Sequence, residues 1–199
     1  MIQRKPPANK GKKYPPEVLT PDEIARLLKT PSNRAPTGIR NRALLYVGYR
    51  AGLRLSEALA LYPKDVKTDK GVVRILHGKG DKARTVGLPL DACVALDRWL
   101  DKRKKLKLNS RAPLFCTLDG KPMSDAYVRS LMKRLQDRSE IQKRVHFQGL
   151  RHTCAWELAK EGAPMPIIQK ALGHTSLQTT DKYLRHVAPM DVIDVIKGR

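Results

Sequence analysis

The sequence predicts a mixed α/β fold that is mostly α-helical and carries a small antiparallel β-sheet. Two observations predict it. Along most of the chain, apolar residues recur at the spacing of one buried helix face. Between residues 71 and 89, by contrast, two short β-rich runs, GVVRILHG and ARTVGLP, flank a polar turn at Lys79–Lys82, as in a hairpin. With 41% hydrophobic residues among 199, the chain can build a folded core.

The first half of the chain contains clear helix boundaries. Thr20 is followed by a proline and then by Glu23, the pattern of a capping box, so we expect a short helix that ends near Lys29. Residues 31–38 are interpreted as a loop. A second helix should end at Gly52, and its apolar face consists of Ala43, Leu44, Val47 and Ala51.

Further helices are expected on both sides of the β-rich runs. Ser56 is a suitable N-cap for a helical stretch within 53–61, and Ser124 for a helix that ends near Arg138. The inward positions of the helix over 89–106 are Val94, Leu96, Trp99 and Leu100. Those of the helix after Ser124 are Val128, Leu131, Met132 and Leu135. After a basic loop, three more helices are predicted at about 150–161, 164–172 and 176–186.

The chain is expected to have three parts. Residues 1–18 form a flexible basic arm, because residues 1–16 include five Lys or Arg and four Pro. Residues 19–186 form one folded domain, and residues 187–199 form a tail that can make one more short amphipathic helix. The three cysteines have apolar neighbours and are expected to be reduced core residues: Cys93, Cys116 and Cys154.

The charge of the chain points to a polyanionic partner. Lys and Arg number 40 against 19 Asp and Glu, which gives a formal net charge of +21. Nucleic acid is the favoured partner. An anionic membrane surface is less favoured, because the cations are not arranged along one amphipathic face. No apolar run has transmembrane length and the N-terminus lacks the apolar stretch of a signal peptide, so we expect a cytoplasmic protein associated with the nucleoid.

Four segments carry a recognisable pattern: GLRLSEALAL at 52–61, HGKGDKARTVGLP at 77–89, GLRHT at 149–153 and LGHTSLQTTDKYLRH at 172–186. Arg54 and Lys79 are 25 residues apart, Arg151 and His174 are 23 apart, and Tyr183 follows His174 by nine. In order, spacing and flanking residues, this set resembles the tyrosine recombinase family, also called phage integrases. The resemblance covers about residues 19–186 and implies the catalytic-domain fold of that family.

The resemblance also implies chemistry at a DNA phosphodiester. Arg54 and Arg151 would hold the non-bridging oxygens through forked hydrogen bonds, and His174 would hydrogen-bond the same phosphate. Tyr183 would attack to form a 3′-phosphotyrosine, and Lys79 would protonate the leaving 5′-oxygen. Because the bond energy stays in that linkage, no metal and no ATP are required. The cations around Tyr183 are expected to favour its phenolate. Each residue also has an ordinary interpretation: a surface arginine, a solvated turn lysine, a C-cap histidine or a packing tyrosine.

Other residues are expected to support this site. Glu57 matches an acidic position that orients a catalytic side chain, and His152 is expected to be structural. Contacts with DNA are predicted for Lys82, Arg84, Lys182 and Arg185.

One position departs from the family pattern. The family usually has histidine three residues before the second arginine, and this chain has Gln148 there. Glutamine can donate a hydrogen bond to a phosphate but cannot exchange a proton near neutral pH. If the family histidine serves as a base toward the tyrosine, either His146 or His152 could replace it here.

The predicted function is site-specific DNA strand exchange by a homotetramer on double-stranded DNA. The family often donates its C-terminal segment to a neighbouring protomer, so the tail at 187–199 could be exchanged or could pack on its own domain. Two alternatives remain open: relaxation of DNA by a type IB topoisomerase-like activity, and a DNA-binding accessory protein with a dormant site. Most family members also have an N-terminal DNA-clamping domain, so this chain is either a short recombinase or a catalytic fragment.

Overall fold

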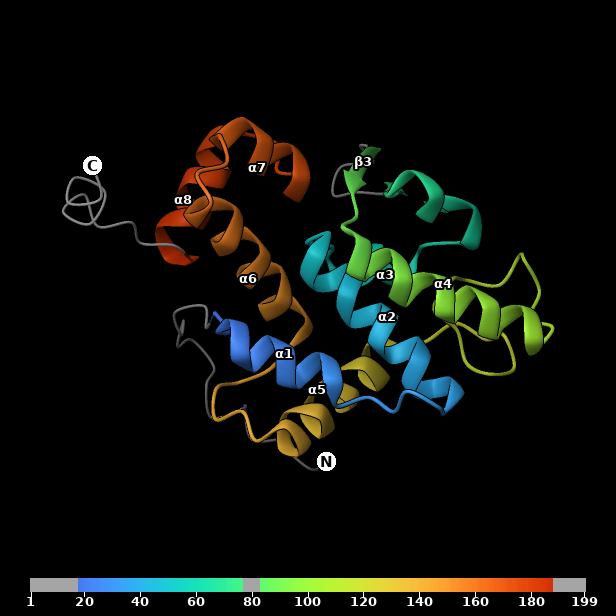
Figure 1. Ribbon diagram of the computed structural model, residues 1–199. Coiled ribbons are helices and arrows are strands. Elements are labelled where there is room, and N and C mark those ends of the chain that lie inside the picture. Colours follow the sequence, from blue (N-terminus) through green and yellow to red (C-terminus); the bar gives the residue numbers. More distant parts are fainter. Residues whose placement is uncertain (1–17, 77–82, 188–199) are drawn as a thin grey trace, which may run out of the picture.

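The computed structural model describes residues 18–76 and 83–187 (Figure 1). It confirms the predicted class, because the described residues form mostly helices and one three-stranded antiparallel sheet. The predicted arm up to residue 17, the turn with Lys79 and Lys82, and residues 188–199 lie outside the described part. The elements are α1 (Pro21–Lys29), α2 (Pro36–Arg50), α3 (Leu55–Leu59), η1 (Pro63–Asp65), β1 (Val66–Lys67), η2 (Thr68–Lys70), β2 (Val72–Ile75), β3 (Arg84–Gly87), α4 (Leu90–Lys105), α5 (Asp125–Ser139), α6 (Phe147–Lys160), α7 (Met165–Leu172) and α8 (Leu177–Val187).

Helix α2 is the centre of the main core. It packs against α4 on one side and α6 on another, while α1 lies across α5 (Figure 1). Its buried residues Leu44, Leu45 and Val47 are fully enclosed. A second, smaller apolar cluster forms where α7 and α8 pack on α6, and it consists of Ala155, Ala159, Ile168, Leu172 and Leu184. Helix α6 therefore joins the two clusters.

Several helix boundaries follow the predicted capping signals. Thr20 caps α1 through its side chain, and Glu23 Oε2 accepts from the Thr20 amide at 2.7 Å. Ser124 caps α5 in the same way, with its hydroxyl accepting from the amide of Tyr127 at 3.1 Å. Because these side chains satisfy amides that the first turn leaves unpaired, the two starts were readable from the sequence.

Three other boundaries differ from the predictions. Helix α2 begins at Pro36, so the loop assigned to 31–38 is too long; proline is favoured in a first turn because it needs no amide partner. Helix α3 begins at Leu55 with Arg54 at its N-cap, so Ser56 is not the cap. Helix α6 begins at Phe147, earlier than predicted, because the ring Nδ1 of His146 accepts from the Gly149 amide at 2.9 Å and caps it.

The sheet brings β3 to the edge of the helical core. The strand order is β1-β2-β3, and Val73 of β2 pairs with Val66 on one side and Val86 on the other. These three valines face the main core. Strand β3 also contacts α7, which places Arg84 at the junction between the sheet and the small cluster.

The rest of the predicted core is largely confirmed. Leu96 and Trp99 of α4 are fully buried, and Leu100 packs partly buried against the core, but Val94 is 51% exposed and does not belong to it. The three cysteines are free and buried, as expected. Within residues 18–76 and 83–187, no helix has the length and apolarity to cross a membrane.

Candidate active site

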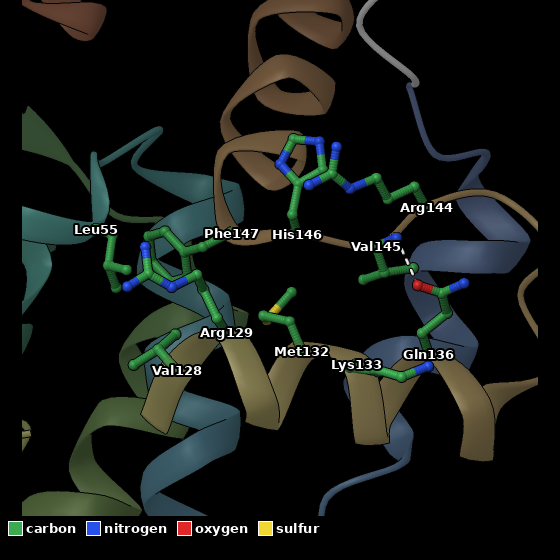
Figure 2. Close-up of a pocket in the computed structure, with 10 residues that line it drawn as sticks. All are labelled: Leu55, Val128, Arg129, Met132, Lys133, Gln136, Arg144, Val145, His146 and Phe147. Carbon is green, nitrogen blue, oxygen red and sulfur yellow. Dashed lines mark hydrogen bonds between the residues drawn. The ribbon is translucent and has the colours of Figure 1, made fainter. Parts of the chain in front are cut away.

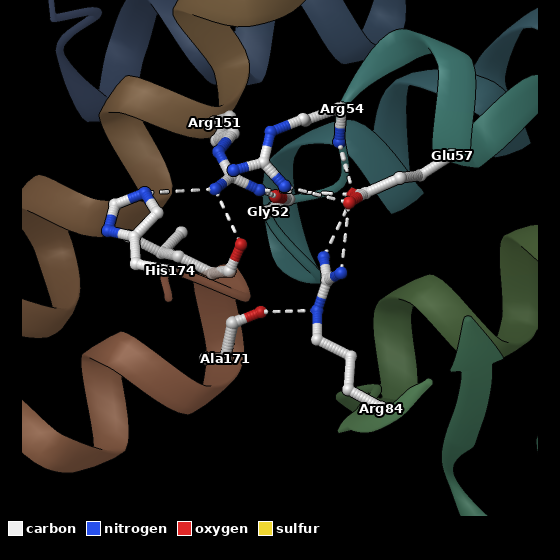
Figure 3. A network of polar contacts seen from close by, with 8 residues as sticks. Gly52, Arg54, Glu57, Arg84, Arg151, Ala171 and His174 are labelled. Carbon is white, nitrogen blue, oxygen red and sulfur yellow. Dashed lines mark hydrogen bonds and ion pairs between the residues drawn. The ribbon is translucent and has the colours of Figure 1, made fainter. Parts of the chain in front are cut away.

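Arg151 is the most enclosed side chain of the predicted site. It projects from α6 and is 0% exposed. Its Nη1 donates to the Gly52 carbonyl and its Nη2 to the Leu172 carbonyl, both at 2.6 Å (Figure 3). Gly52 follows the end of α2 and Leu172 is the last residue of α7, and helix C-termini offer unpaired carbonyls and partial negative charge. Two helix ends thus orient one guanidinium. Burial and then the nearby Arg54 lower the pKa of Arg151 to about 10, so it stays charged at neutral pH.

Glu57 lies at the centre of three arginines. Its carboxylate is 2% exposed and accepts from Arg54 Nη1 at 2.8 Å, from the Arg54 amide at 2.9 Å, and from both terminal nitrogens of Arg84 at 2.8 and 2.9 Å. Arg151 Nη1 lies 3.9 Å from Glu57 Oε2. Burial alone would raise the pKa of Glu57, but the hydrogen bonds and charges of Arg84 and Arg54 outweigh it and lower the pKa to about 2.

Arg84 has a structural partner at each end of its guanidinium. Its two terminal nitrogens bind Glu57, and its Nε donates to the Ala171 carbonyl of α7 at 3.2 Å (Figure 3). The side chain is 11% exposed. Its predicted contact with DNA stays a prediction, whereas the observed contacts connect β3, α3 and α7.

Gly173 allows the close approach of Arg84 to α7. It ends α7 with φ +64°, and a Cβ there would lie 2.7 Å from Arg84 Nη1. We expect Gly173→Ala to lower the free energy of unfolding by about 1–2 kcal/mol through the left-handed backbone, and by a further amount because its Cβ would displace Arg84 from Glu57. Urea unfolding of wild type and variant measures the loss.

Gly162→Ala is the matched control for this substitution. Gly162 also has a positive φ, +77°, but a Cβ there would meet nothing within 4 Å. It should therefore lose only the backbone contribution of about 1–2 kcal/mol. Equal losses of stability in the two variants would contradict the role given to the Arg84–Glu57 contact.

His174 connects Arg151 to α8. Its Nε2 lies 3.2 Å from Arg151 Nη2, and its Nδ1 lies 3.0 Å from the hydroxyl of the fully buried Thr180. Burial, Arg151 and Arg54 lower the pKa of His174 to about 4, so the ring is neutral near pH 7. Since an arginine can only donate, Nε2 accepts and Nδ1 carries the proton. The predicted hydrogen bond from His174 to a phosphate therefore needs the other tautomer or the charged ring.

Tyr183 lies against both histidines of the site. Its ring centroid is 5.1 Å from that of His174 and 5.2 Å from that of His152, and its hydroxyl is 2.6 Å from His152 Nδ1. Arg151 and Arg54 favour the phenolate, as expected of neighbouring cations, but burial outweighs them. Burial raises the pKa of Tyr183, and the opposing effect of Arg151 is smaller. The hydroxyl therefore needs a proton acceptor before it can attack.

The remaining predicted residues lie at the edge of the site or beyond the described part. Gln148 is exposed in the first turn of α6, one turn before Arg151. Arg185 is exposed on α8, and its Nε donates to Asp181 at 2.9 Å. Lys79 and Lys82 are not described, and neither is the side chain of Lys182. Among the described residues, no group of three or more His, Cys, Asp and Glu is placed to hold a metal ion.

Sequence reasoning missed several groups that hold the site together. The carbonyls of Leu172 and Ala171 and the hydroxyl of Thr180 each bind a predicted site residue. The run LGHTSLQTT contains no signal that would single out Thr180 among its neighbours. Backbone acceptors leave no trace in side-chain identity, so only the ends of helices indicate where they lie.

A pocket of about 350 Å³ opens beside the site, between α5 and the start of α6 (Figure 2). Its floor is apolar and includes Phe147 and Leu55, the residue after Arg54. Exposed cations line the pocket as well: Arg129, Lys133 and Arg144. The amide of Val145 donates to Gln136 across one wall at 3.0 Å. The pocket thus combines positive charge with the helix that carries Arg151.

Comparison with known proteins identifies the family. The model of the phage integrase family matches residues 17–189, so the chain belongs to this family of tyrosine recombinases. Tyrosine recombinase XerD of Bifidobacterium longum (strain NCC 2705) is 36% identical over 197 residues, covering 94% of this chain and 63% of that protein. Tyrosine recombinase XerC of Xanthomonas axonopodis pv. citri (strain 306) is 37% identical over 176 residues, covering 88% and 56%. The chain spans less than two thirds of these relatives.

Solved structures show the same fold. The crystal structure of XerA recombinase superposes with a TM-score of 0.79 at 26% identity, covering 98% of this chain and 68% of that one. The XerH site-specific recombinase bound to difH substrate, in a pre-cleavage complex, gives a TM-score of 0.74 at 29% identity, covering 94% and 54%. The predicted catalytic-domain fold is therefore confirmed.

Proposed function

We propose that this protein is a site-specific DNA recombinase that cuts and rejoins DNA through a covalent 3′-phosphotyrosine intermediate. One observation carries the proposal: Arg151 on α6, His174 between α7 and α8, and Tyr183 on α8 form one contiguous cluster, with Arg54 bound through Glu57 at its edge. The two guanidiniums supply positive charge for a phosphate, and the tyrosine supplies a nucleophile. The named relatives are tyrosine recombinases, which supports the same activity here.

The arginines divide the work of holding the phosphate. Arg54 is 25% exposed on its side chain, so its guanidinium can reach a non-bridging oxygen while Glu57 orients it. Arg151 is enclosed, and its Nε is buried without a hydrogen-bond partner among the described residues. An unpaired buried donor is costly, and a phosphate oxygen would relieve that cost. The site is thus arranged to gain from an anion that the free protein lacks.

The bond changes follow from this placement. Tyr183 Oη attacks phosphorus and loses its proton, while the bond from phosphorus to the 5′-oxygen breaks. We assign the proton for the leaving oxygen to Lys79, as the family pattern implies. Gln148 is assigned a hydrogen bond to the phosphate, for which its exposed amide is suited. Resealing reverses each transfer and needs no external energy.

We further infer that double-stranded DNA binds across the site and the pocket beside it. The charge of +21 and the pocket cations support phosphate contacts there, and Lys82, Arg84, Lys182 and Arg185 are proposed to add to them. XerH has been solved with its difH substrate, which supports a DNA partner for a chain of this fold. A homotetramer linked through residues 187–199, acting in the cytoplasm at the nucleoid, remains our proposal for the assembly.

The alternatives are less favoured. The same tyrosine chemistry could relax supercoils, but the relatives and structures named above are recombinases. An accessory protein with a dormant site would not need a tyrosine hydroxyl in contact with a neutral histidine.

Covalent trapping tests the proposed function. Nicked suicide duplexes made from the DNA that flanks the gene are incubated with protein and separated on a denaturing gel. We expect an adduct with wild type and none with Tyr183→Phe, because the phenylalanine has no nucleophilic oxygen.

Tyr49→Phe is the matched control for this experiment. Tyr49 is a buried tyrosine that, like the partly buried Tyr183, has a bonded hydroxyl, which donates to Glu157 at 2.7 Å outside the site. Its loss should leave the adduct unchanged. An adduct that persists in Tyr183→Phe would exclude Tyr183 as the nucleophile, and firm binding without any wild-type adduct would favour the accessory protein.

A further inference from the structure

His152 makes a contact that its expected structural role does not explain. It follows Arg151 on α6, and its Nδ1 lies 2.6 Å from the hydroxyl of Tyr183 on α8. The two rings are tilted by 31° relative to one another, and their centroids are 5.2 Å apart. At this distance the hydroxyl proton and the Nδ1 lone pair form a short hydrogen bond.

The protonation states define the direction of that bond. Burial, His146 and Arg151 lower the pKa of His152 to about 4, and burial raises the pKa of Tyr183. At neutral pH the pair is therefore a neutral imidazole and a neutral phenol. A phenol is the stronger acid of the two and an imidazole nitrogen the better acceptor, so Tyr183 donates and His152 Nδ1 accepts.

We propose that His152 is the general base that takes the proton of Tyr183 during cleavage. The inference rests on the proposed recombinase function and identifies the residue that accepts the proton of the nucleophile. As the bond between Oη and phosphorus forms, the hydroxyl proton moves to His152 Nδ1 and the 5′-oxygen leaves with a proton from its own donor. When the 5′-hydroxyl reattacks, the imidazolium returns its proton to Oη. The negative charge of the bound phosphate stabilises the imidazolium, which offsets its low basicity in the free protein.

Neither of the other candidates can fill this role. Gln148 is exposed, and an amide does not accept a proton near neutral pH. His146 already uses its Nδ1 to cap α6, at 2.9 Å from the Gly149 amide. Its ring meets that of His152 edge to face at a centroid distance of 6.2 Å, so it shapes the surroundings of His152. Among the described groups, His146, Arg151 and Tyr183 are those that face His152.

His152→Asn tests the proposal, because asparagine places an oxygen near the position of Nδ1 and can accept the hydroxyl but not its proton. Single-turnover cleavage of the flanking-DNA suicide duplexes is measured from about pH 6 to 9. We expect a loss of about 10²- to 10⁴-fold at neutral pH. We also expect the variant's rate to rise about tenfold per pH unit, as hydroxide replaces the base, while the wild-type rate stays nearly flat.

A DNA substrate with sulfur at the bridging 5′ position separates the role of the general base from that of the general acid. When sulfur replaces the bridging 5′-oxygen, the leaving group needs no proton, so a defect in the acid is relieved and a defect in the base is not. The rate of His152→Asn should stay low on this substrate. Added imidazole should raise the rate of His152→Ala, which leaves room for it, and should not affect Tyr183→Phe.

Each outcome decides the inference. If the cleavage rate of His152→Asn lies within about threefold of the wild-type rate, or if its pH profile is parallel to the wild-type profile, His152 is not the general base. The proposed recombinase function would not be affected by that result. A wild-type protein that forms no adduct would overturn the function itself. If asparagine weakens folding, thermal unfolding will reveal it, and the imidazole dependence of His152→Ala then decides, since only a missing proton acceptor is replaced by a free one.

Discussion

An Arg151→Lys variant should cleave DNA about 10²- to 10³-fold more slowly than wild type, the usual cost of losing one preorganised donor to a developing oxyanion. Lysine keeps the charge but has a single nitrogen. It cannot bind the Gly52 and Leu172 carbonyls at 2.6 Å and also present a directed N–H to a phosphate. Affinity for DNA should change little, because many phosphate contacts share it. Single-turnover cleavage and a binding titration separate the two quantities.

Arg103→Lys is the control for the structural part of this effect. Arg103 is 3% exposed on α4, and its Nη1 donates to the carbonyls of Pro113 and Leu114 at 2.7 and 2.9 Å. Its replacement should lower stability and leave cleavage by the folded protein unchanged. If Arg103→Lys slows cleavage as much as Arg151→Lys does, Arg151 acts only through folding.

Glu57→Gln is expected to lower the free energy of unfolding by about 3–5 kcal/mol at pH 7, the range for breaking a buried ion pair. The amide would leave Arg84 and Arg54 without their shared counter-ion and would turn an N–H toward one of them. Urea unfolding of wild type and variant measures the difference. Glu23→Gln is the control, because Glu23 has the same position in the α1 capping box and its ionic partner among the described residues is the partly exposed Lys143. It should cost about 1 kcal/mol or less.

Acid should remove this stabilisation in a defined range. The pKa of Glu57 is about 2 in the folded protein, below the ordinary value of 4.5. A depressed folded pKa gives stability that is complete above pH 4.5 and is lost as the pH falls through about 2. The shift corresponds to about 3 kcal/mol. The stability difference between wild type and Glu57→Gln should therefore narrow below pH 4.5. A difference that stays constant down to pH 2 would contradict the assigned ion pairs.

Much of the fold was predictable from the sequence, because helix caps and β-rich runs are local signals. Thr20 and Ser124 cap helices where predicted, and the two short β-rich runs on either side of a polar turn indicated the sheet. Helix α6 was predicted to start too late, because a histidine cap is not among the common N-cap residues. The cap became visible only once the backbone had placed the Gly149 amide against the His146 ring.

Four residues of the predicted site lie together in the structure, but the protonation of the tyrosine was not predictable from the sequence. The spacing of the motifs predicted that Arg54, Arg151, His174 and Tyr183 belong to one site. The structure places them in one cluster. The basic neighbours of Tyr183 suggested a lowered pKa, yet burial raises it. Burial depends on how α8 packs on α6, which is a tertiary property. The same packing creates the contact of Tyr183 with His152.

The two helix ends that hold Arg151 belong to different parts of the molecule. Gly52 lies in the main core, whereas Leu172 belongs to the small cluster formed by α6, α7 and α8. That cluster has few apolar members, so the docking of α7 and α8 depends strongly on polar contacts to Arg151, Arg84 and His152. A phosphate bound at Arg151 and the docked state of the nucleophile helix are consequently linked by one coupling free energy. By reciprocity, the factor by which docking of the helix raises the affinity for phosphate equals the factor by which bound phosphate raises the equilibrium constant for docking.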